Sequence, residues 1–181
     1  MKKFDVALLS KKLHLPITRG IIETKRLSFF KRVLRFFTFV RRFEIMKDYL
    51  LWYEDLKMYI LLPASFIYDG ASVPKILGTI YSSVGVLYVG SGPHDLGYRY
   101  GGLFLVDPES GEVSFKEMSK RELDLIFDNL CAEETGMRIA SGLARNTLSF
   151  FGLFTWRSMR KKTNIPEKDF PSLYVEIKKE A

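Results

Sequence analysis

Two consecutive runs of aromatic and aliphatic residues, 43–52 and 57–68, constrain the fold more than any other part of the sequence. Both runs have the composition of β-strands, and Glu54–Asp55 between them suits a turn. We therefore expect an antiparallel hairpin, with Pro63 at an edge or a bulge because proline cannot donate to a strand ladder. The second strand should end at Asp69–Gly70, after which the sequence favours the start of a helix.

Later patterns predict a second hairpin and two helices. Residues 103–106 and 112–115 have strand composition and flank a turn-forming segment, while residues 94–100 are consistent with a short helix. Ser119 and Glu122 have the spacing of a capping box. Apolar residues follow with helical spacing, namely Leu123, Ile126, Phe127 and Leu130. The sequence therefore predicts an α+β fold in which N-terminal β-hairpins lie beside a helical layer.

The chain divides into three expected segments. Residues 1–42 form an N-terminal segment with a basic aromatic helix, and residues 43–160 form the central domain. Residues 161–181 contain two prolines and mixed charge, so we expect a loosely attached tail that ends in a short strand.

The basic aromatic segment from Lys25 to Arg42 contains no acidic residue. The whole chain has 28 Lys and Arg against 21 Asp and Glu, a net charge of +7 that favours contact with an anionic partner. On a helix, positions 29, 33, 36 and 40 would form an apolar stripe flanked by arginines. Such a helix can lie on an anionic phospholipid surface, or pack on the core with a solvated basic face. Nucleic acid is not the expected partner, because no base-reading or stacking motif accompanies the charges.

The single cysteine and the apolar segments limit where in the cell we expect the protein. Cys131 is the only cysteine, so the chain cannot form an internal disulfide, and a reducing compartment is the simplest inference. Asp5 interrupts the short apolar run near the start, so we expect no secretory signal peptide. The weakly polar stretches 76–92 and 143–156 are broken by Gly and Ser or by Arg and Asn, so we expect no transmembrane span.

His94, Asp95 and Asp124 are the residues best suited to chemistry. Adjacent helical side chains point about 100° apart, so His94 can face a reacting group while Asp95 holds a cation. In a metal-assisted ester hydrolase, a neutral histidine takes a proton from water and a second carboxylate, here Asp124, fixes its tautomer. Asp69 and backbone carbonyls of the Asp69–Gly70 loop could add the oxygen ligands that Ca²⁺ requires.

Each of these residues also has a structural interpretation. His94 can be a surface histidine or a hydrogen-bonded core histidine, and Asp95 can be an acid favoured by a helix dipole. Asp124 can simply be solvated, and Asp69 can be a turn former. Tyr98, one turn after His94, can be a packing aromatic with a hydrogen-bonded hydroxyl group. The sequence contains no glycine-rich phosphate loop, nucleophile elbow or zinc motif.

The segments that carry these candidates resemble a known family. Asp-Gly-Ala-Ser-Val-Pro at 69–74, His-Asp-Leu-Gly-Tyr-Arg at 94–99 and Leu-Asp-Leu-Ile-Phe at 123–127 are similar to the family numbered 1353 among domains of unknown function. The resemblance covers roughly residues 43 to 155. It implies a bacteriophage or prophage protein and implies no activity, because no biochemical role is established for that family.

The same residues also resemble phospholipases A2, particularly the viral capsid type, with the patterns H-D-x-x-Y and A-D-x-x-F. His94, Asp95 and Tyr98 match the first pattern, and Asp124 matches the second. This similarity implies that His94 is the base, Asp95 a Ca²⁺ ligand and Asp124 the residue that orients the base, on a phospholipase A2-like helix pair. The chain departs from the pattern in lacking disulfides and the Y-G-x-x-G calcium loop. It also has a hairpin between the motifs, Leu123 in place of alanine and Gly97 in place of a bulky residue.

Two classes of function are therefore expected. The first is a phage-associated or prophage-associated hydrolase that uses Ca²⁺ to cleave phospholipid esters, with His94, Asp124 and Tyr98 as catalytic residues and with Asp95, Asp69 and Gly70 at the metal. The second is a non-enzymatic virion or tail-assembly protein that contacts other phage structural proteins. Either would be found in the host cytoplasm or in the virion.

Overall fold

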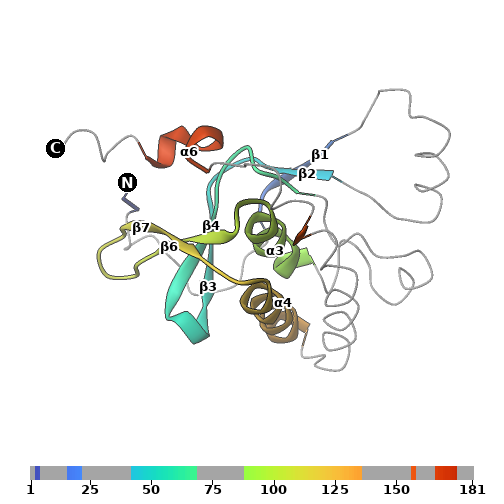
Figure 1. Cartoon of the computed structure of the whole chain (residues 1–181). Coiled ribbons are helices and arrows are strands. Elements are labelled where there is room, and N and C mark those ends of the chain that lie inside the picture. Colours follow the sequence, from blue (N-terminus) through green and yellow to red (C-terminus); the bar gives the residue numbers. More distant parts are fainter. Residues whose placement is uncertain are drawn as a thin grey trace, which may run out of the picture.

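A computed structural model describes residues 3–4, 16–21, 42–68, 88–135, 156–157 and 166–174. Within these residues the fold is α+β, as the sequence predicts, and contains two antiparallel sheets (Figure 1). Strands β3 (Tyr49–Tyr53), β4 (Met58–Leu62), β6 (Gly102–Val106) and β7 (Val113–Glu117) form one sheet in the order β3-β4-β6-β7. Strands β1 (Thr18–Ile21), β2 (Arg42–Ile45) and β5 (Ile67–Tyr68) form the other, in the order β1-β2-β5.

The hairpin predicted from 43–52 and 57–68 is present, but it is divided between the two sheets. Strands β3 and β4 pair antiparallel around a 3-10 turn, and β2 and β5 pair antiparallel in the other sheet. At the division, the Ala64 N–H donates to the Asp48 side chain at 2.7 Å and the Ser65 N–H donates to the Ile45 carbonyl at 2.7 Å. Ser65 adopts a positive φ of 66°, and Pro63 precedes it without an N–H to donate. The prediction of one continuous strand on each side of the turn is therefore wrong.

The later elements agree with the sequence in type. The hairpin β6–β7 is confirmed, and helix α4 (Lys120–Thr135) begins at the predicted capping box. There the Glu122 carboxylate accepts from the Ser119 N–H at 2.7 Å, and the Ser119 hydroxyl accepts from the Glu122 N–H at 3.3 Å. Helix α3 (Tyr88–Tyr100) begins six residues before the predicted start at 94. Gly90 and Gly92 hid this first part of the helix in the sequence, but in the structure they pack closely against neighbouring elements.

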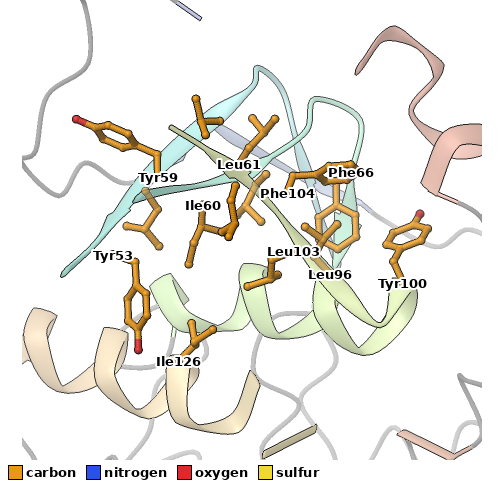
Figure 2. Close-up of a cluster of buried hydrophobic side chains, with 14 of the residues drawn as sticks. Tyr53, Tyr59, Ile60, Leu61, Phe66, Leu96, Tyr100, Leu103, Phe104 and Ile126 are labelled. Atoms are coloured by element: carbon orange, nitrogen blue, oxygen red, sulfur yellow. The ribbon is translucent and has the colours of Figure 1, made fainter. Parts of the chain in front are cut away.

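Helix α3 lies between the four-stranded sheet and α4 (Figure 2). Its buried residues, including Leu96, pack with Ile60 of β4 and Leu103 of β6 in one hydrophobic core. No helix among the residues described above is long and apolar enough to cross a membrane.

The C-terminal region differs from the expected loose tail. A short helix, α6 (Pro166–Asp169), and a 3-10 helix (Pro171–Leu173) pack onto the core, with Phe170 7% and Leu173 1% exposed. The Phe170 and Leu173 side chains, three residues apart, belong to the hydrophobic core and attach this segment to it. The short strand expected at 173–177 does not begin where predicted, because Leu173 ends the 3-10 helix, and residues 175–177 lie outside the described residues. Most of the Lys25–Arg42 segment lies outside them too, as does most of the apolar segment 137–159, which the sequence also predicts to be helical.

Candidate functional site

Glycines on α3 allow α4 to approach it closely. A Cβ atom at Gly97 would lie 2.3 Å from Leu123 Cδ2, and one at Gly90 would lie 2.8 Å from Cys131 Sγ. The later glycine meets the earlier α4 residue, so the two helices run antiparallel. His94 lies between these glycines in the sequence and faces α4 with them, because helical residues three or four apart share a face.

The two residues that meet at this close contact, Gly97 and Leu123, are both departures from the phospholipase A2 pattern. The missing side chain at Gly97 provides the space that the larger Leu123 side chain fills. Leu123 is itself only 1% exposed, so it cannot turn into solvent to relieve a collision. Gly97 and Leu123 are therefore complementary in size, and together they allow α3 and α4 to pack closely.

This contact brings His94 of α3 to Asp124 of α4. His94 Nε2 lies 3.2 Å from Asp124 Oδ1, and the two residues are 7% and 6% exposed. The Tyr98 hydroxyl donates to the same oxygen at 2.7 Å, and Lys120 Nζ lies 2.5 Å from the other oxygen, Oδ2. Both carboxylate oxygens of Asp124 thus have partners within the protein. Three of the four groups, His94, Tyr98 and Asp124, are those selected from the sequence.

The hydrogen bond to Asp124 determines the tautomer of His94. A carboxylate can only accept, so in the neutral imidazole the proton lies on Nε2 and Nδ1 keeps its lone pair. Burial opposes the charged imidazolium, but the hydrogen bond to Asp124 and the nearby Asp95 outweigh it and raise the pKa of His94. For Asp124, burial likewise opposes the charge, while His94, Lys120 and Tyr98 together lower the pKa of the carboxyl. The pair therefore favours a negative Asp124 that stabilises positive charge on His94.

Aromatic rings fix the His94 ring in place. Its centroid lies 4.0 Å from that of Tyr98 and 5.2 Å from that of Phe127. Tyr98 in turn contacts Trp156 edge to face, with centroids 5.2 Å apart. Burial and the Asp124 carboxylate raise the pKa of Tyr98, so its hydroxyl remains a neutral donor. Tyr98 is therefore placed to hold Asp124 rather than to transfer its own proton.

Asp95 differs from Asp124 in exposure. Its side chain is 27% exposed, and its Oδ1 lies 3.9 Å from His94 Nδ1, which is too far for a direct hydrogen bond. This carboxylate is more accessible than the buried Asp124 to a hard cation, which takes oxygen ligands, because more of its side chain is exposed. Asp69 and Gly70 lie outside the described residues. Within the part of the chain that the structure describes, no group of three or more His, Cys, Asp or Glu side chains could hold a metal ion.

Lys120 is the site residue that sequence reasoning missed. Its position four residues before Asp124 on one helix is a recognised spacing for an ion pair. The sequence signal at the start of this helix, the capping box, involves its neighbours Ser119 and Glu122 and does not identify Lys120. Its side chain is only 15% exposed, so Lys120 adds a nearly buried positive charge to the cluster.

Comparison of the sequence with known protein families, with curated proteins and with solved structures gave no match. The α+β class rests on the described strands and helices, while the resemblances to family 1353 and to phospholipases A2 stay predictions.

Proposed function

We propose that this protein is an ester hydrolase in which His94 is the general base. The observation that carries the proposal is the fixed orientation of His94, whose Nε2 is bound by a buried carboxylate. The same bond leaves Nδ1 as the proton acceptor, on the side of the partly exposed Asp95.

The chain's own residues can perform the proton transfer in a defined order. His94 Nδ1 accepts a proton from a water molecule as that water attacks the ester carbonyl. The imidazolium that forms is stabilised by the negative charge of Asp124. Tyr98 and Lys120 hold that carboxylate in position, so little reorganisation accompanies the transfer. His94 then returns the proton to the departing alcohol.

A divalent cation fits the proposal through Asp95. When bound, Ca²⁺ would stabilise the negative charge that develops on the ester oxygen. Asp95 is the described residue that would hold it, and Asp69 with the Gly70 carbonyl are the further ligands expected from sequence.

We propose anionic phospholipid as the substrate class. The net charge of +7 and the acid-free Lys25–Arg42 segment favour attraction to such a surface. The assignment to a phage or prophage comes from the resemblance to family 1353.

The test measures fatty-acid release from phosphatidylglycerol vesicles by the wild-type protein and by His94→Gln, with Ca²⁺ or a chelator present. Since general base catalysis contributes about 10²–10⁴-fold, we expect His94→Gln to lose at least about 100-fold in turnover. Glu109→Gln, in the exposed β6–β7 turn, is the matched control and should keep full activity. Turnover that is unchanged in His94→Gln removes His94 as the base.

The cation is tested separately by thermal melting. Ca²⁺ should raise the Tm of the wild-type protein, because a ligand that binds only the folded state stabilises it. The rise should be smaller in Asp95→Asn. Equal rises in the two proteins would remove Asp95 as a ligand.

A non-enzymatic role as a virion or tail-assembly component is the second candidate. The observation that favours it is the burial of His94 among Tyr98 and Phe127, which also suits a purely structural hydrogen-bond cluster. In that case His94→Gln would lower stability, while the wild-type protein would release no fatty acid under any condition.

A further inference from the structure

The described contacts of the C-terminal anchor, residues 166–174, with the core come from the side chains of Asp169, Phe170, Leu173 and Tyr174. Seven of its nine residues are at least partly exposed, and Phe170 and Leu173 are the two that are buried. The N–H groups of Phe170, Leu173 and Tyr174 donate to carbonyl groups of Pro166, Phe170 and Pro171, all within the anchor. The anchor therefore forms its own small helical turns and attaches through side chains.

Phe170 packs into a cluster of three aromatic rings, Phe66, Tyr100 and Phe104, which we call the aromatic cluster. The ring centroids lie 6.3, 5.5 and 5.9 Å from that of Phe170, each in an edge-to-face arrangement. Figure 2 shows the three rings at the same end of the core, contributed by the segment before β5, by the end of α3 and by β6.

A polar contact defines the orientation of the anchor. The Tyr100 hydroxyl donates to Asp169 Oδ2 at 2.8 Å, beside the buried Phe170 ring. Arg99 lies over the Phe66 ring, 5.1 Å from its centroid, so a positive charge borders the aromatic cluster. The contacts thus select an acidic residue, a phenylalanine next to it and an apolar residue three positions later.

We propose that the C-terminal anchor is a reversible docking segment, and that the aromatic cluster with Arg99 is a binding site for peptides of the form Asp-Phe-x-x-Leu. In the isolated chain its own residues 169–173 occupy the site. This arrangement has the features of short peptide recognition, in which a few buried anchor side chains and one oriented polar contact are presented by a locally folded segment. The proposal does not depend on the hydrolase function, because the aromatic cluster lies outside the His94–Asp124 pair.

The first test is native-state hydrogen exchange on the full wild-type chain. If the anchor opens independently, the N–H groups of Phe170, Leu173 and Tyr174 should exchange at least 100-fold faster than those paired between β4 and β6. Lys168→Gln, at an exposed anchor position, should leave these rates unchanged, and Tyr100→Phe should increase them. Exchange of the anchor at the same rate as β6 would show that it opens only with global unfolding and would overturn the proposal.

The second test supplies the anchor as a separate peptide. A labelled peptide of residues 164–176 is added to the full chain carrying Phe170→Ala and to the wild-type chain. We expect at least tenfold tighter binding to the variant, whose site lacks its own phenylalanine, and no binding by a peptide that itself carries Phe170→Ala. Failure of the wild-type peptide to bind a variant whose β6 amides remain protected would overturn the proposal, as would equal binding of the two peptides.

Discussion

Substitution of Gly97 by alanine tests whether close helix contact holds the candidate site together. The added Cβ would lie 2.3, 2.8 and 3.0 Å from Leu123 Cδ2, Cδ1 and Cγ, so it overlaps the whole end of that side chain. Inserting a methyl group into a packed core costs about 1–3 kcal/mol, while the better helix propensity of alanine returns about 1 kcal/mol. Two of the three distances are below 3.0 Å, so we expect a cost in the upper half of that range and a net loss of about 1–2 kcal/mol in the free energy of unfolding.

A double-mutant cycle separates this collision from a general effect of alanine. Leu123→Ala alone should cost about 2–5 kcal/mol, because it leaves a cavity. In the double variant the new methyl group at 97 enters that cavity, so the total loss should be at least about 1 kcal/mol smaller than the sum of the two. Gly20→Ala is the control, because a Cβ there has no atom within 4 Å. Its stability should equal or slightly exceed that of the wild type.

Urea unfolding followed by circular dichroism gives these free energies, and the His94 side-chain NMR signals report on the site. The wider separation of the helices in Gly97→Ala should weaken the bond between His94 and Asp124, and the second substitution should restore it. Losses that add without coupling, or a Gly97→Ala protein as stable as the Gly20→Ala control, would refute the packing explanation.

Three further predictions concern charge. Lys120→Met should cost about 1–3 kcal/mol, because it leaves a nearly buried oxygen of Asp124 without its partner; urea unfolding that shows no loss would remove Lys120 from the cluster. The folded-state pKa of Asp124 is lowered, so its stabilising contribution is present above about pH 4 and is lost as the pH falls. The stability difference between the wild type and Asp124→Asn should therefore shrink in acid, and a constant difference would contradict the shift. Burial raises the pKa of Tyr53 to about 12, so the free energy of unfolding should fall as the pH rises from 10 to 12. The fall should be less steep in Tyr53→Phe, which lacks the titrating hydroxyl group.

The elements that could be predicted are those encoded by neighbouring residues. The capping box at Ser119 fixed the start of α4, and turn-forming residues between two apolar runs fixed the β6–β7 hairpin. The division of the first hairpin could not be predicted in the same way. It depends on the Asp48 side chain reaching the backbone of Ala64, sixteen residues away, which no local pattern records.

The candidate site shows the same distinction. The sequence spacing places His94 and Tyr98 on one face of a helix, and the four-residue spacing of Lys120 and Asp124 likewise predicts an ion pair. The meeting of His94 with Asp124, thirty residues later, was expected from the chemistry of a metal-assisted ester hydrolase and from the resemblance to phospholipases A2, and not from a local pattern. Its physical basis is the glycine face of α3, which from the sequence indicated only a weak helix.

The two aspartates near His94, Asp95 and Asp124, differ in exposure and suit different roles. Asp124 has a partner on each oxygen and is 6% exposed, so it can hold the base but has no free oxygen to offer a cation. Asp95 keeps a side chain that is 27% exposed beside Nδ1, the ring nitrogen that the Asp124 bond leaves as an acceptor. A structural cluster requires only the first arrangement, whereas hydrolysis with a bound cation requires both. The comparison of Asp95→Asn with Asp124→Asn therefore separates the two proposals, because only the hydrolase depends on Asp95.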